Sequence, residues 1–99
     1  MFNIWKMSEE EMIQYLKEME RHIRMQGFIS HMKECEKALH SAVMIMEKRP
    51  EEMRLSPDDS IRYLNELLYK TRKNRFFPFY DKSWIALKNA IKELEKHRR

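Results

Sequence analysis

The amino-acid sequence predicts an all-α protein, an antiparallel four-helix bundle. The 99 residues include one Gly and three Pro, too few for the many turns of an all-β protein. Helix-favouring residues such as Ala, Leu, Met, Glu, Lys and Arg are abundant instead. Four amphipathic segments with short connections, at about 9–26, 31–48, 57–73 and 82–97, favour antiparallel neighbours in one domain, 1–99. Two helical hairpins completed by dimerisation are the alternative.

The first predicted helix, 9–26, has a clear start. Ser8 can cap it, and Glu11 stands three residues on, which completes a capping box. Gly27 supplies a stop after the last turn. One apolar face recurs at spacings of four, three and four, formed by Met12, Leu16, Met19 and Ile23.

The second predicted helix, 31–48, runs to the residues before Pro50, because a proline disfavours the helical conformation of the residue before it. Its apolar stripe, at spacings of three and four, is formed by Met32, Cys35, Leu39, Ala42 and Met46. Three methionines lie off the apolar stripes and could furnish an adaptable contact surface, namely Met25, Met44 and Met53.

The third predicted helix, 57–73, starts with Ser56 as cap and Pro57 at the first helical position. The fourth, 82–97, is expected to start at Asp81 or Ser83. Their stripes are Ile61, Leu64 and Leu68, with Leu67 beside them, and Trp84, Leu87, Ile91 and Leu94. The residues predicted to be buried are Leu16, Leu39, Leu64, Leu68, Leu87 and Ile91.

The net charge of +4 lies wholly in the second half of the chain. Residues 1–50 hold 8 Lys or Arg and 8 Asp or Glu, and residues 51–99 hold 12 and 8. This favours an acidic partner or an anionic membrane surface. Cys35 is the only cysteine, which excludes an internal disulfide, and the N-terminus lacks the features of a signal peptide. We therefore expect a soluble cytoplasmic protein, with peripheral membrane association left open.

The sequence predicts no metal site, no cofactor and no enzymatic activity. His31 and Cys35 are spaced i,i+4, but a zinc site needs three or four ligands and no second Cys/His pair exists. The spacing of Glu18 with His22 is also i,i+4, whereas di-iron bundles use Glu-x-x-His. A single Gly excludes a glycine-rich phosphate loop, and a lone Cys in a helical stripe indicates packing rather than nucleophilic catalysis.

Residues 70–82, "KTRKNRFFPFYDK", form the candidate contact region. Cations come first and aromatic rings follow around Pro78, an order that differs from the interleaved cations and rings of single-strand binders. We expect some rings to plug the end of the bundle and others to remain available to a protein or membrane interface. The predicted partner-binding residues are Lys70, Arg72, Lys73, Arg75, Phe77, Phe79 and Tyr80.

The order of residues from 36 to 94 resembles the immunity proteins of pediocin-like (class IIa) bacteriocins, the enterocin A immunity group. Leu55 and Pro57 come before and at the start of the third helix, and the segment 74–76 and Tyr80 lead into the fourth. Along the third helix, the likeness is carried by Ile61, Leu64, Leu68, Tyr69 and Thr71. Members of that family often carry a tail beyond the fourth helix, whereas this chain stops at "KHRR".

The resemblance implies a small cytosolic four-helix bundle that binds a protein and catalyses nothing. Such proteins lock the complex of bacteriocin and sugar-phosphotransferase permease at the inner membrane face, so that no lethal pore stays open. The chain would act as a monomer or weak dimer, with the segment 70–80 as its contact. A helical regulator or inhibitor of another protein, and a weak basic nucleic-acid-binding bundle, are the alternatives.

Overall fold

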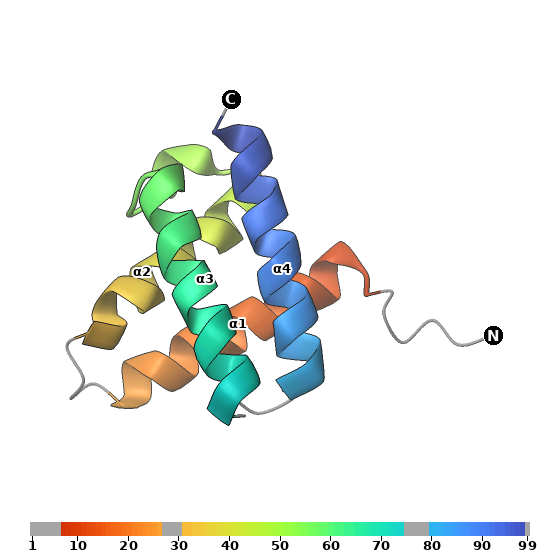
Figure 1. Ribbon diagram of the computed structural model, residues 1–99. Helices are drawn as coiled ribbons and strands as arrows, with labels where there is room; N and C mark the ends of the chain where they lie inside the picture. Colours follow the sequence, from red (N-terminus) through yellow and green to blue (C-terminus); the bar gives the residue numbers. More distant parts are fainter. Residues whose placement is uncertain (1–6, 27–30, 75–79, 99) are drawn as a thin grey trace.

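The computed structural model of the protein describes residues 7–26, 31–74 and 80–98, with side chains except at 26, 31, 70–74, 80 and 81. Four α-helices follow one another along the chain (Figure 1). They are α1 (Glu9–Gln26), α2 (His31–Met46), α3 (Pro57–Asn74) and α4 (Tyr80–His97), and a short 3-10 helix, η1 (Pro50–Glu52), lies between α2 and α3. No strand occurs in this described part, and the predicted all-α fold is confirmed.

The helices form a closed bundle in which consecutive helices run in opposite directions (Figure 1). Each helix contacts its neighbours in the order α1, α2, α3, α4 and back to α1, and α2 also contacts α4 across the middle. In Figure 1, α3 and α4 lie side by side in front, and α1 passes obliquely behind them. The arrangement is therefore a four-helix bundle built from two crossed hairpins.

The starts of α1 and α3 follow the caps that the sequence predicts. The backbone N–H of Glu11 donates to Ser8 Oγ at 3.1 Å, and the N–H of Ser8 donates to Glu11 Oε1 at 2.9 Å. This reciprocal pair is the expected capping box. At α3, the N–H of Asp59 donates to Ser56 Oγ at 3.2 Å, and Pro57 occupies the first helical position.

The end of α2 differs from the prediction, since the helix stops at Met46 rather than at residue 48. Lys48 has φ 65°, and its N–H donates to the carbonyl of Ile45 while the N–H of Arg49 donates to the carbonyl of Met44. These two bonds form a Schellman motif, with Lys48 at the left-handed position that usually holds Gly. The turn thus ends the helix before Pro50 can act.

Lys48→Gly is expected to raise the free energy of unfolding by about 1 kcal/mol. The left-handed conformation is less favourable by about this amount for a residue that has a Cβ than for Gly. The control Lys48→Ala removes the same side chain but keeps the Cβ, so its urea midpoint should stay near that of the parent. Equal midpoints for the Gly and Ala variants would contradict the assignment of strain to this position.

The start of α4 also differs from the prediction. The helix begins at Tyr80, two residues before the predicted 82, so Asp81 and Ser83 lie within its first turn and neither is its cap. Ser83 is only 1% exposed. It faces the core because α4 turns a seam of small residues toward its neighbours.

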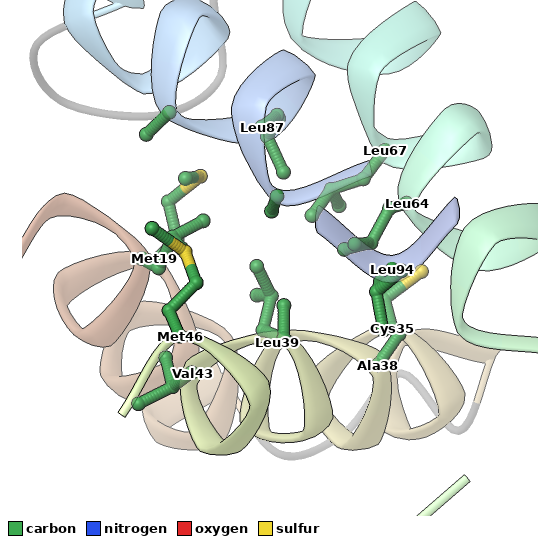
Figure 2. Close-up of a cluster of buried hydrophobic side chains, with 14 of the residues drawn as sticks. Met19, Cys35, Ala38, Leu39, Val43, Met46, Leu64, Leu67, Leu87 and Leu94 are labelled. Carbon is green, nitrogen blue, oxygen red and sulfur yellow. The ribbon is translucent and has the colours of Figure 1, made fainter. Parts of the chain in front are cut away.

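The core is centred on α2, which packs against every other helix and η1. Figure 2 shows Cys35, Ala38 and Leu39 on the side of α2 that faces α3 and α4, and Met46 beside Met19 of α1. In the second half of α2 all six residues from 41 to 46 are buried. Met44 is therefore a core residue and not available to a contact surface, whereas Met25 is 77% exposed and Met53 is half-buried against the core.

The buried faces of α3 and α4 are rotated relative to the predicted stripes. Leu16, Leu39, Leu64 and Leu87 are fully buried as predicted. Leu68 and Ile91 are only half-buried, whereas Leu67 and Leu94 are wholly inaccessible. The cause is a set of small buried residues that let the helices approach closely, namely Ser60, Ser83, Ala86 and Ala90. A stripe drawn through the large apolar residues alone overlooks them.

Two buried serines have different surroundings. Ser41 Oγ accepts hydrogen bonds from the backbone N–H groups of Arg54 and Leu55, at 2.9 and 3.0 Å, and so ties α2 to the connection that precedes α3. Ser60 Oγ is also buried, but it has no hydrogen-bond partner within the described part of the chain. One hydroxyl therefore holds two elements together, and the other carries a desolvation cost.

Polar contacts also join α1 to α2 and to the turn after it. Lys17 Nζ lies 3.0 Å from Glu47 Oε2, and this hydrogen bond, reinforced by Arg49, lowers the pKa of the Glu47 carboxyl. Arg24 bridges Glu36 and Glu20 at 2.8 Å each, and the hydrogen bond that Arg24 donates to Glu36 is the main cause of the raised pKa of the Arg24 guanidinium. Glu20 is only 8% exposed, so Arg24 compensates a carboxylate at the α1–α2 interface.

Candidate functional site

The predicted contact region lies where α3 ends and α4 begins. The backbone of α3 is described to Asn74 and that of α4 from Tyr80, so residues 75–79 connect one end of this hairpin. The structure describes no side chain of the predicted partner-binding residues, which are Lys70, Arg72, Lys73, Arg75, Phe77, Phe79 and Tyr80. The division of the rings between core plug and contact surface therefore stays a prediction.

An open groove between α1 and α4 combines apolar and basic groups. It has a volume of about 410 Å³ and is lined by Met12 of α1 and by Ile85, Lys88, Asn89 and Lys92 of α4. Met12, Ile85 and Asn89 are half-buried, whereas both lysines are exposed. We call these five residues the α1–α4 groove.

The two lysines of the groove differ from most described cations. Neither makes an ion pair with a described carboxylate, and the Lys88 ammonium lies over the Trp84 ring, 4.7 Å from its centroid. Most other described cations have a carboxylate partner, namely Lys17, Arg21, Arg24, Lys37, Arg49, Arg62, Lys96 and Arg98. The groove thus presents positive charge that the described fold does not neutralise.

A second pocket, of about 310 Å³, lies between the C-terminal ends of α2 and α4. It is lined by Ile45, Lys48, Pro50, Glu93, Lys96 and His97. Lys96 already pairs with Glu93 at 3.4 Å, and Arg98 nearby in the chain pairs with Asp58 at 2.9 Å. This pocket offers less uncompensated charge than the α1–α4 groove.

Three of the residues considered for metal binding or nucleophilic chemistry make contacts within the fold, namely Cys35, Glu18 and Glu36. Cys35 is fully buried, as expected for a packed residue, and its Sγ lies 3.9 Å from the carbonyl of Tyr63. Glu18 pairs with Arg21, and Glu36 with Arg24. His31 lies outside the described side chains. Among the described residues, no group of three or more His, Cys, Asp or Glu could hold a metal ion.

In the described part of the chain, no helix has both the length and the apolar character needed to cross a membrane. Comparisons with protein-family models, with curated proteins and with solved structures found no match to this chain. The class that the fold and surfaces define is accordingly a small all-α bundle with a basic, partly apolar groove.

Sequence reasoning did not find the α1–α4 groove, although a signal for it exists. Ile85, Lys88, Asn89 and Lys92 recur at spacings of three, four and seven, which places them on one face of a helix. That face could not be distinguished from an ordinary solvated face, because only the packing of α1 beside it supplies Met12 and the recess.

Proposed function

We propose that the protein is a non-catalytic helical binding protein that protects a cell against a pediocin-like bacteriocin. The observation that carries the proposal is the residue order from 55 to 80, which resembles the bacteriocin immunity group. Support comes from the way this stretch is used in the fold, because its first part forms α3, begun by the Ser56 cap and Pro57. A four-helix bundle is also the fold that the resemblance implies.

The proposed partner is the complex of bacteriocin and sugar permease, met from the cytoplasmic face of the membrane. Its contacts would come from the end of the α3–α4 hairpin, with Lys70, Arg72, Lys73 and Arg75 for acidic groups. Aromatic anchors contribute most where they enter a partner's apolar pocket, and the candidates are Phe77, Phe79 and Tyr80.

The test is expression in a bacteriocin-sensitive strain, followed by challenge with a panel of pediocin-like peptides. We expect tolerance to at least one peptide when the protein is made inside the cell, and none when purified protein is added outside. Combined replacement of Arg72, Lys73 and Arg75 by Ser should abolish tolerance with little change in the urea midpoint, because surface cations contribute little to folding stability.

The matched control is the combined replacement of Arg21, Lys33 and Arg54 by Ser, which removes the same charge from exposed positions elsewhere. This control should protect as the parent does. Absence of tolerance across the panel, with the protein folded and abundant, would reject immunity and leave a helical regulator of another protein. Tight binding to single-stranded nucleic acid at physiological salt would instead favour the nucleic-acid alternative. Contacts to phosphates alone weaken steeply with salt, so such binding would require contacts to the bases as well.

A further inference from the structure

We propose that the α1–α4 groove is a second binding surface, whose partner is an acidic amphipathic helix of another protein. This inference goes beyond the proposed immunity function, because the groove uses Met12 and the middle of α4 and none of the seven residues at the hairpin end. Its test does not depend on whether the protein recognises a bacteriocin.

Charge is the first observation that points to an acidic partner. Lys88 and Lys92 stand one helical turn apart on α4, where like charges destabilise a helix slightly. Neither is neutralised by a described carboxylate, although most cations on the described surface are. Carboxylates placed beside these two ammonium groups would relieve the repulsion and form ion pairs that are partly shielded from water.

The apolar lining is the second observation, and it distinguishes the groove from a merely basic surface. Met12 and Ile85 line the groove from opposite helices and are each only half-buried. A volume of about 410 Å³ lies near the lower end of the range of about 300–1,000 Å³ typical of ligand pockets. The flexible Met12 side chain can adapt to the apolar group that enters.

The spacing of these groups selects a helix as the occupant. A partner helix presents side chains at i and i+4 on one face, which matches two lysines that are themselves four residues apart. Helix-in-groove recognition uses the same geometry, with apolar anchors flanked by charges that set the orientation. The proposed partner helix therefore places an apolar residue in the groove. It carries two acidic residues, Asp or Glu, one turn apart beside that apolar residue.

Two other anionic partners fit the groove less well. A membrane surface is met by protruding apolar groups, whereas Met12 and Ile85 line a recess. A single-stranded nucleic acid is held by exposed rings that stack on bases, and the described residues that line the groove include no aromatic side chain. Vesicles and single-stranded DNA are therefore comparison ligands in the test.

The experiment selects binders from a phage-displayed library of helical peptides with one randomised face, using the full-length protein. We expect enriched peptides to carry acidic residues one turn apart beside an apolar residue. Their affinity, measured by fluorescence anisotropy, should fall at least about tenfold for the Lys88→Glu/Lys92→Glu double variant, because facing like charges are strongly unfavourable. Replacing the apolar residue of the peptide by Ser should weaken binding as well.

The matched control is Lys33→Glu/Arg54→Glu, which changes the net charge equally at exposed positions outside the groove and should bind as the parent does. If the Lys88→Glu/Lys92→Glu variant does not give the helical circular dichroism of the parent, a Lys88→Gln/Lys92→Gln variant is used in its place. Its affinity for the peptides is then expected to fall several-fold. Enrichment of non-acidic peptides, no enrichment, or equal losses in control and groove variants would overturn the proposal. Binding to phosphatidylglycerol vesicles or to single-stranded DNA would also overturn the proposal if it depended on Lys88 and Lys92 more strongly than peptide binding does.

Discussion

Replacing Leu67 with Ala is expected to lower the free energy of unfolding by about 2–5 kcal/mol, the usual cost of such a change in a packed core. Leu67 is 0% exposed and its side chain lies near Leu87 of α4 in the core (Figure 2). The same change at Leu68, the next residue, should cost markedly less, because that side chain is only half-buried. A small domain has only about 5–15 kcal/mol of stability, so the difference is large.

Urea unfolding of the two variants, followed by circular dichroism, measures this pair directly. The adjacent positions share secondary structure and chemistry, so each variant controls for the other. A larger loss for Leu68→Ala than for Leu67→Ala would mean that α3 is rotated back toward the stripe drawn from its large apolar residues. It would also displace the seam of Ser60, Leu64 and Leu67 from the interior.

Two of the buried serines, Ser41 and Ser60, should respond in opposite directions when replaced by Ala. Ser41→Ala removes the acceptor of two backbone N–H groups, those of Arg54 and Leu55. A donor left unsatisfied costs about 1–3 kcal/mol, so we expect a total loss of about 2–4 kcal/mol. Ser60→Ala removes a buried hydroxyl without a described partner, and this should stabilise the fold by up to about 1 kcal/mol.

Thermal and urea unfolding of both Ser→Ala variants provide the comparison, with each serving as the chemical control of the other. The sign of the change is the informative quantity, because both substitutions remove one oxygen atom from a helix. Destabilisation by Ser60→Ala as large as that by Ser41→Ala would show that Ser60 has a hydrogen-bond partner. A neutral Ser41→Ala would remove the tie between α2 and the connection before α3.

The helical fold could be predicted from the sequence because its signals are local. Caps such as Ser8 with Glu11, and Ser56 before Pro57, act within one turn of the chain. The end of α2 could not be placed, since it depends on Lys48 adopting a conformation that sequence rules reserve for Gly. The rotation of α3 and α4 was missed because close packing at Ala86 and Ala90 is decided by the neighbouring helices.

The two candidate sites differ in the same way, because one could be predicted from local sequence and the other depends on the folded structure. Residues 70–80 are visible in the sequence as a block of cations and rings, so they could be proposed at once. The α1–α4 groove joins Met12 to residues more than seventy positions later in the chain, and only the fold brings them together. Unpaired charge is likewise a property of the folded surface, because pairs such as Arg98 with Asp58 join distant segments.

The burial of α2 from residue 41 to residue 46 also limits how this protein could diversify. This half of α2 has no face on which a substitution avoids neighbouring side chains, so a change of side-chain volume there must be matched by changes in another helix. The outer faces of α1, α3 and α4 carry no such coupling at their exposed positions. New partner preferences can therefore arise at exposed positions of those three helices by single substitutions, while the segment 41–46 of α2 tolerates few changes made alone.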